Sequence, residues 1–322
     1  MTTAVASAVI TRAQSSRRVL RRIAGSLLIV VVLAGAGSYL GVSYVIAERF
    51  THAMRSAIGR APMVAAPSYE NVVFKSTDGV TLRGWFFPVS GDRAAIIVHG
   101  KDGNRIGGEH RTNERIAEYL IAHGFSVLLF DLRGSGESDG DRFSLGYLER
   151  RDVAAAIDEV AARGFRPDRI ALIGISMGAG TVLQTLLLRP DVGAVVADSA
   201  YSDARTIVTE NLESVAHVPS WFTPGVLVMS NAAFGLNGDA VRPIDVVRAH
   251  PERAFLFIHC GGDELIATHH AYELKAASAN PSSDLWMAAA CQHAWAFPTY
   301  PTAYEAHLIA FLDTQIPVSA AR

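Results

Sequence analysis

A serine flanked by two glycines is the residue of this chain best suited to covalent chemistry. The run GISMG occupies 174–178, directly after an apolar stretch and directly before a stretch of helical composition. A nucleophilic serine must stand on a sharp turn between strand and helix, where glycines let neighbouring backbone pass close and the helix N-terminus favours developing negative charge. The pattern therefore predicts Ser176 as a nucleophile, with Gly174 and Gly178 shaping the turn.

Two polar residues further along the chain could activate this serine. A serine hydroxyl needs a base to take its proton, and the base needs a carboxylate to orient it. Asp263 follows the apolar stretch 255–258, and His293 follows the apolar stretch 285–289. In a parallel sheet both would lie past the carboxyl ends of strands, where such sites form. We predict His293 as general base and then acid, and Asp263 as the residue that fixes the imidazole tautomer.

A second carboxylate competes for the role of the acid. Asp198 follows the apolar stretch 194–197 and would lie at the same sheet edge. In this class of sheet the acid follows the nucleophile and precedes the histidine, and Asp263 lies directly before His293 in that order. We therefore prefer Asp263, and Asp198 is the alternative acid or a residue that shapes the pocket floor.

Backbone N–H groups must stabilise the tetrahedral oxygen that forms during such a reaction. Met177, directly after the nucleophile, supplies one by its position. The second is expected in the loop after the apolar stretch 95–98, which begins with the residues His99-Gly100-Lys101. We predict the backbone amide of Lys101 as this donor, with its ammonium group in solvent.

These motifs and three others resemble the α/β-hydrolase superfamily, more narrowly its membrane-anchored, serine aminopeptidase-like (S33-type) branch. The further motifs are DLRGSGES at 131–138, Asp-Ser at 198–199 and Gly-Asp at 262–263. The resemblance covers about 69–315. It implies an eight-stranded, mostly parallel sheet, a helical cap between strands six and seven, a Ser-Asp-His triad and no cofactor. One departure is local, because Cys260 stands where such proteins often have glycine.

The remaining pattern agrees with one α/β domain at 69–316. Short apolar stretches alternate with amphipathic ones, which implies a mostly parallel sheet covered by helices on both faces. Strands are predicted at 71–75, 81–87, 95–98, 126–130, 170–173, 194–197, 255–258 and 285–289, and helices at 113–122, 149–162, 177–188, 269–277 and 303–312.

The segment at about 200–250 interrupts this alternation. It has no clear core strand and carries Trp221, Phe222 and Phe234. A connection this long in a compact domain is usually functional, and we expect a lid. The alternative is a helical excursion that only adds packing.

The N-terminal region predicts a membrane anchor. Residues 23–47 contain no charged residue and are long enough to cross a hydrocarbon core of about 30 Å. The stretch 1–22 is basic, so we expect it in the cytoplasm and the catalytic domain outside, joined by a linker at 48–68. Its basic residues are Arg12, Arg17, Arg18, Arg21 and Arg22. The alternative is a secreted protein whose signal peptide is cleaved at the Ala-Gly-Ala run 34–36.

Composition excludes several classes of protein. The chain has 322 residues, 50% of them hydrophobic and 19% charged, so it is not a disordered chain. With 29 Lys and Arg against 31 Asp and Glu, it lacks the basic excess of a general nucleic-acid binder. His269 and His270 open a helix without the carboxylate–histidine spacing of a metal site, so we predict no metal.

The two cysteines lie close to the predicted acid and base. Cys260 precedes Asp263 by three residues and Cys291 precedes His293 by two. If acid and base touch, the two thiols lie on neighbouring loops and could form a disulfide in an oxidising compartment. We favour two buried thiols and keep the disulfide as the alternative.

The sequence thus predicts a membrane-anchored serine hydrolase without cofactor. Its expected substrate is a small-molecule or lipid-like ester, cleaved through an acyl-enzyme on Ser176. The alternatives are a peptidase or thioesterase with the same triad, or a catalytically silent, membrane-tethered interaction module.

Overall fold

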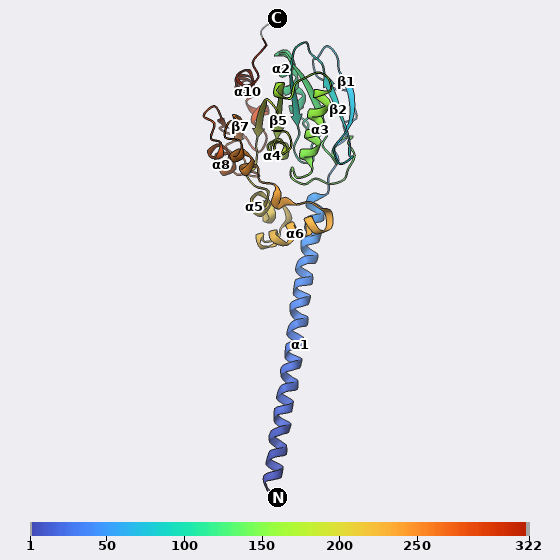
Figure 1. The fold of residues 1–322 in the computed structure, drawn as a ribbon, viewed down its shortest axis with the longest axis vertical. Helices are drawn as coiled ribbons and strands as arrows, with labels where there is room; N and C mark the ends of the chain where they lie inside the picture. The colour runs from blue at the N-terminus through green and yellow to red at the C-terminus, as the bar shows by residue number, and fades with distance from the viewer. Residues whose placement is uncertain (1, 320–322) are drawn as a thin grey trace.

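A long N-terminal helix and an α/β domain make up the chain in the computed structural model (Figure 1). The structure describes residues 2–319, and for residues 2–18 it describes the backbone alone. The helix, α1 (Thr2–Thr51), extends from one end of the domain, and the C-terminus lies at the opposite end (Figure 1).

Eight strands form a single sheet in the described part of the chain, in the order β1-β2-β4-β3-β5-β6-β7-β8. From β4 to β8 every neighbouring pair is parallel, whereas β2 is antiparallel to both of its neighbours. The expected eight-stranded, mostly parallel sheet is therefore confirmed. The strands are β1 (Glu70–Lys75), β2 (Thr81–Phe87), β3 (Arg93–Val98), β4 (Phe125–Phe130), β5 (Ile170–Ile175), β6 (Ala194–Asp198), β7 (Phe255–Cys260) and β8 (Asp284–Ala288).

Helices cover both faces of this sheet because its central strands are apolar on both sides. On one face, Ile97 of β3 packs in a core with residues of α2 (Thr112–Ala122) and α10 (Pro301–Gln315). On the other face, its neighbour Ile96 packs with residues of α3 (Glu149–Ala161), α4 (Met177–Thr185) and α8 (His269–Ala277). Successive residues of one strand thus enter two separate cores.

The segment 200–250, hereafter the cap, is helical. It follows β6 and returns to β7, so it lies at the edge where the parallel strands end (Figure 1). Its elements are α5 (Ala204–Ala216), the short 3-10 turns Ser220–Phe222 and Gly238–Ala240, α6 (Thr223–Phe234) and α7 (Pro243–Ala249).

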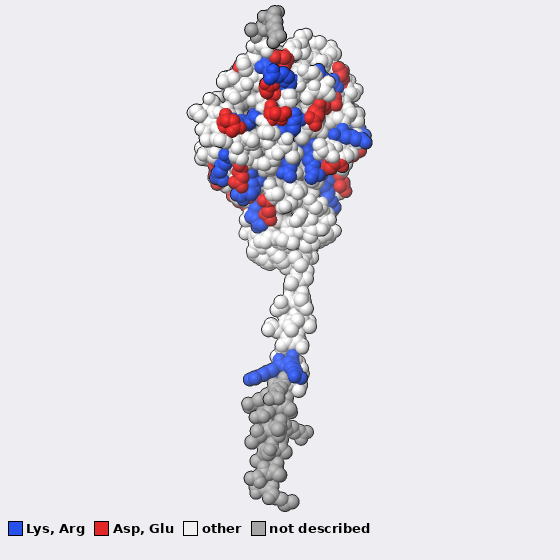
Figure 2. Space-filling model, viewed as in Figure 1, with Lys and Arg blue, Asp and Glu red and all other residues white. Residues whose placement is uncertain are grey.

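Helix α1 contains a stretch that could cross a membrane. Val19–Thr51 is long and apolar enough, with a mean hydropathy of 2.1 over its best window, whose residues are all outside the protein core. Arg21 and Arg22 stand near the start of this stretch (Figure 2). The side chains of 1–18, including part of the expected basic segment, lie outside the described residues. The helix continues to Thr51, so the first four residues of the expected linker are helical.

The last three turns of α1 pack against the cap. Tyr39, Ser43, Ile46, Ala47 and Phe50 are spaced so that they share one helix face, and Ser43 and Ala47 are fully buried. Their main partner is α6, which approaches through Gly225. A Cβ at that glycine would lie 2.3 Å from Ser43 Oγ, so the two helices touch closely.

One tyrosine of α1 also completes the start of α6. The Tyr39 hydroxyl accepts a hydrogen bond from the Gly225 N–H at 3.0 Å and lies 3.2 Å from the carbonyl oxygen of Trp221. The first N–H groups of a helix have no partner within it, and α6 has no side-chain cap of its own. Tyr39 takes that place from another helix, so α1 forms part of the cap's structure.

The extended segment after α1 is fastened to the domain. Ala53 N–H donates to Asp141 O at 2.9 Å, and Phe143 N–H donates to Thr51 O at 2.9 Å. Further along, the buried Glu114 carboxylate accepts hydrogen bonds from Arg60 and from the Met63 N–H. The part of the expected linker that follows the helix therefore lies against the domain.

Replacing Gly225 by valine should loosen α1 from α6. The new side chain would meet Ser43 and Tyr39, and overpacking of this kind costs about 1–3 kcal/mol. We expect a thermal midpoint several degrees lower for the full chain in detergent. Ala232→Val, on an exposed part of α6, is the control and should leave the midpoint unchanged. Equal midpoints for the two variants would contradict this packing.

Candidate active site

Ser176 lies on the expected turn between β5 and α4. Its backbone has φ 57° and ψ −120°, a strained conformation for a residue with a side chain. The flanking glycines are required by close contacts, because a Cβ at Gly174 would lie 2.3 Å from Gly178 O and one at Gly178 would lie 2.2 Å from Val98 O. The turn therefore holds the serine at the carboxyl edge of the sheet.

The structure brings Ser176, His293 and Asp263 together. His293 Nε2 is 2.7 Å from Ser176 Oγ, and His293 Nδ1 is 2.7 Å from Asp263 Oδ2. Because a carboxylate only accepts hydrogen bonds, His293 Nδ1 carries a proton and Nε2 can accept the serine hydroxyl proton. This is the arrangement that general-base activation of a serine requires.

The predicted acid, Asp263, is held by its own loop. Asp263 Oδ1 accepts hydrogen bonds from the N–H groups of Leu265 and Ile266 at 3.0 and 2.8 Å, which leaves Oδ2 for the histidine. The Ile266 carbonyl accepts a hydrogen bond from Nε2 of the buried His259 at 2.9 Å. Burial lowers the pKa of His259, so the ring is neutral at neutral pH and acts as a brace for this loop.

The loops that carry Asp263 and His293 are covalently joined. Cys260 and Cys291 form a disulfide with their Cα atoms 5.1 Å apart, so the favoured expectation of two thiols is wrong. Cys260 ends β7 and Cys291 follows β8, and these strands are neighbours in the sheet. The residue that departs from the family pattern is therefore one half of a bridge beside the site.

Asp198 lies at the same edge but outside the hydrogen-bond chain of Asp263. Its carboxylate is fully buried and accepts a hydrogen bond from Ser199 Oγ at 2.9 Å, and that hydroxyl also accepts from the Ala294 N–H at 3.2 Å. Burial raises the pKa of Asp198 from 3.8 to about 6. The alternative acid thus supports the backbone next to His293 and does not contact its ring by a hydrogen bond.

The loop expected to stabilise the oxyanion passes beside the serine. A Cβ at Gly100 would lie 3.1 Å from Ser176 Cβ. The buried His99 accepts a hydrogen bond from the Leu132 N–H at Nε2, so its Nδ1–H donates to Gly100 O at 2.7 Å. The same planar trans peptide carries the Lys101 N–H, which must point away from that carbonyl. His99 therefore fixes the orientation of the predicted donor.

The structure also places Met177, the other predicted donor, and the Lys101 side chain. Met177 is the first residue of α4, where helix N–H groups have no partner within the helix. The Lys101 ammonium is part-exposed, pairs with Asp102 and lies 4.7 Å from the centre of the Phe143 ring.

The DLRGSGES run at 131–138 is a structural network. The buried Asp131 carboxylate accepts hydrogen bonds from the Arg105 guanidinium at 2.6 Å and from the Glu137 N–H at 2.9 Å. Arg133 is buried against Asp152 at 2.6 Å. Leu132 in the same loop donates its N–H to His99. The motif therefore supports the predicted oxyanion loop that begins at His99 and makes no contact with Ser176.

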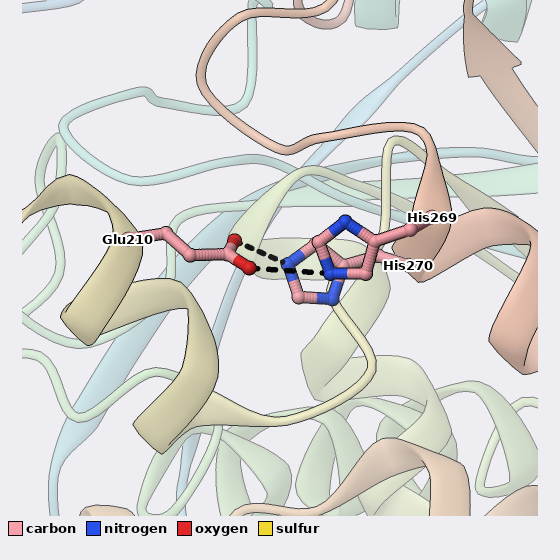
Figure 3. A group of neighbouring side chains, drawn as sticks. All are labelled: Glu210, His269 and His270. Carbon is pink, nitrogen blue, oxygen red and sulfur yellow. Dashed lines mark hydrogen bonds and ion pairs between the residues drawn. The ribbon is translucent and has the colours of Figure 1, made fainter.

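A contact between cap and core was missed by sequence reasoning. The Glu210 carboxylate of α5 lies 3.2 Å from His269 Nε2 and 3.0 Å from His270 Nε2, both on α8 (Figure 3). The three side chains offer possible ligand atoms within 4.8 Å of one another. Burial lowers the pKa of His270, so its contact with Glu210 is a hydrogen bond at neutral pH. Glu210 and His270 are 60 positions apart, so no local pattern in the sequence could predict this cluster.

Comparison with known sequences places the chain within a family. A model of the family described as serine aminopeptidase, S33, matches residues 92–256, about half of the chain. The uncharacterized protein YfhR of Escherichia coli K12 is 34% identical over 150 residues, 44% of this chain and 51% of that protein. The chain thus spans about half the length of that relative. The YfhR protein of Salmonella typhi is 28% identical over 263 residues, 77% of this chain and 82% of that protein.

Solved structures show the same fold. The esterase Pf2001 of Pyrococcus furiosus superposes with a TM-score of 0.69 at 23% identity, covering 83% of this chain and 98% of that one. Est1E of Butyrivibrio proteoclasticus, with ferulic acid bound, gives a TM-score of 0.59 at 18% identity, covering 76% and 99%. The expected α/β-hydrolase fold is confirmed.

Replacing Asp198 by asparagine should change how stability depends on pH. In the unfolded chain this carboxyl ionises with its ordinary pKa of 3.8, whereas in the folded chain burial raises that pKa to about 6. Between these two pH values the unfolded chain releases the proton first, which favours unfolding. The wild type therefore loses stability across this window by on the order of 3 kcal/mol, and the variant avoids that loss. Denaturant unfolding between pH 4 and 7 should show that the free energy of unfolding of the variant rises relative to that of the wild type as pH increases. A difference that stays constant with pH would contradict the burial of this charge.

Proposed function

The chain belongs to the serine aminopeptidase, S33, family of α/β-hydrolases, and on that premise we propose that it is a membrane-anchored serine esterase. The observation that carries the proposal is the hydrogen-bond chain from Ser176 through His293 to Asp263, with both contacts at 2.7 Å. Its parts lie at the carboxyl edge of the sheet, where such enzymes bind substrate.

The proposed reaction has two halves. Ser176 Oγ attacks the ester carbonyl while His293 takes the hydroxyl proton, and the N–H groups of Lys101 and Met177 stabilise the negative oxygen. His293 then returns the proton to the leaving alcohol, which gives an acyl-enzyme. Water, activated by His293, attacks the acyl group and releases the acid. Asp263 holds the tautomer that makes both proton transfers possible.

The surroundings favour an ester over a peptide. An aminopeptidase needs an acidic group for the free amine of its substrate, and four of the five carboxylates in cap residues 200–250 are engaged elsewhere, including Asp245, which pairs with Arg242 and Arg248. Asp203 pairs with Arg242, Asp239 pairs with Arg205, and Glu210 contacts the histidines of α8. The similar structure Pf2001 is described as an esterase, which agrees with this preference.

Membrane anchoring is supported by α1 and by the disulfide. The apolar part of α1 is one uninterrupted helix with arginines near its start, which favours an N-terminus in the cytoplasm. The bridge between Cys260 and Cys291 suits an oxidising compartment, where a domain on the other side of the membrane would lie. The alternative is a secreted enzyme whose signal peptide is cleaved after the run 34–36. A mature protein shorter by about that length would select it.

Ser176→Ala should abolish ester hydrolysis by the full chain in detergent. Loss of a nucleophile lowers kcat by about 10⁴-fold or more, since only binding and the oxyanion donors remain. We would measure p-nitrophenyl esters of increasing acyl length, with Ser214→Ala on the exposed surface of the cap as control. Activity that survives in Ser176→Ala would exclude this serine as the nucleophile. Cleavage of peptides or thioesters in place of esters would select the alternative substrates.

Asp263→Asn should be far more damaging than Asp198→Asn. The amide would favour the wrong tautomer of His293, a change that costs about 10⁴-fold in enzymes of this type. Asp198→Asn keeps an acceptor for Ser199 and should lower kcat by less than about tenfold. The two variants assayed side by side decide the acid, and equal losses would make Asp198 an equal partner in catalysis.

A further inference from the structure

Helix α1 reaches the domain at the edge where Ser176 lies. The segment after the helix is held by the loops that follow β3 and β4, both at the carboxyl edge of the sheet. Met54 N–H donates to Asp102 Oδ1 at 3.2 Å in the first loop, and Ala53 N–H donates to Asp141 O at 2.9 Å in the second. A membrane around α1 would therefore face the active-site edge and the cap (Figure 1).

The cap is free of charge where it meets α1. Residues 214–238, which include all of α6, contain no Lys, Arg, Asp or Glu. On the face drawn in Figure 2 the end of the domain next to α1 is white, whereas charged groups of both signs are spread among white areas over the rest of the domain. Large apolar side chains of this segment are exposed, with Val215, Trp221 and Val228 at 54%, 61% and 57%.

The cap meets α1 at a distance along the helix that would place it near the far boundary of the hydrocarbon core. Tyr39 lies sixteen residues beyond Ile23, about 24 Å along the helix axis, and a hydrocarbon core is about 30 Å thick. Trp221 stacks on Tyr39 with ring centres 5.5 Å apart. A tryptophan and a tyrosine at this depth lie near the boundary of acyl chains and headgroups, where both residue types are enriched in membrane proteins.

We propose that cap residues 214–238 lie in the membrane leaflet on the side of the catalytic domain, and that the substrate is an ester whose acyl chain lies in that leaflet. The substrate class rests on the proposed esterase activity. The location of the cap rests on the proposed membrane anchoring by α1 and not on that activity.

Continuity with α1 identifies lipid as the occupant of this surface. Leu40, Val42 and Val45 of α1 are 42%, 41% and 55% exposed and lie at the same level as the cap contact. The exposed apolar surface thus runs from the helix onto α6 without a charged boundary. Acyl chains that surround α1 would cover both parts, as they cover the apolar face of an interfacial helix.

Tryptophan fluorescence tests the location without any assay of activity. The full chain would be reconstituted in phosphatidylcholine vesicles with and without bromine on the acyl chains, which quenches nearby indoles. We expect quenching of the wild type that Trp221→Phe largely removes. Trp286→Phe is the control, because Trp286 lies within β8 and stacks on His307 of α10, away from the cap, and it should keep the quenching. Equal quenching in wild type and Trp221→Phe, or none in either, would overturn the location.

A charge on α6 tests the route of the substrate. Val228→Asp should lower hydrolysis of an oleoyl ester embedded in the vesicles at least fivefold and leave soluble p-nitrophenyl acetate within twofold. Leu187→Asp introduces the same charge at an exposed position beyond the far end of α4, away from the edge of Ser176, and should affect neither.

The outcomes separate the two proposals. Equal effects of Val228→Asp on the two esters, or no effect on either, would overturn the proposal that the substrate reaches the site from the leaflet. A wild type that cleaves neither ester would instead overturn the esterase function, while the quenching experiment would still decide where the cap lies. A chain that forms dimers in solution and shows no quenching of Trp221 in the vesicles would assign this surface to a second copy of the chain. That result would overturn the proposal that lipid covers it.

Discussion

The hydrogen bond between Ser176 and His293 is the contact that most of the structure serves. The two residues are 117 positions apart, yet Ser176 Oγ and His293 Nε2 lie 2.7 Å from each other. A parallel sheet makes this possible because its strands all end at one edge, so that loops after β5, β7 and β8 converge there. The disulfide between Cys260 and Cys291 joins the last two of these loops at their base, which limits how far Asp263 and His293 can separate.

Helix α1 has two roles in this arrangement. It is apolar enough to cross a membrane, and its last turns complete the domain, since Tyr39 supplies the partner for the first N–H groups of α6. Removing the chain up to the end of the extended segment would uncover α6 and delete the contacts of Arg60 with Glu114. A soluble fragment would therefore differ from the full enzyme in its cap as well as in its anchoring.

Local patterns in the sequence were enough to predict the sheet and to pick out the three residues that the structure brings together at its edge. Apolar stretches of four to seven residues define the strands, and the order of Ser176, Asp263 and His293 follows from the loops after them. Contacts that depend on shape were beyond such patterns. Nothing near Gly225 in the sequence indicates that Ser43 lies against it, and Glu210 meets His270 only because the cap folds back on α8. The pairing of the cysteines likewise depended on the distance between two loops.

The most direct test is the reaction of the folded full chain with a fluorophosphonate, followed by peptide mapping with tandem mass spectrometry. Such a reagent modifies a serine only when a neighbouring base has activated it. The hydrogen-bond geometry predicts a single phosphonylated residue, Ser176, and no adduct once His293 is replaced by alanine. A folded chain that forms no adduct, or that is modified at another serine, would contradict the assignment of this edge as an active site.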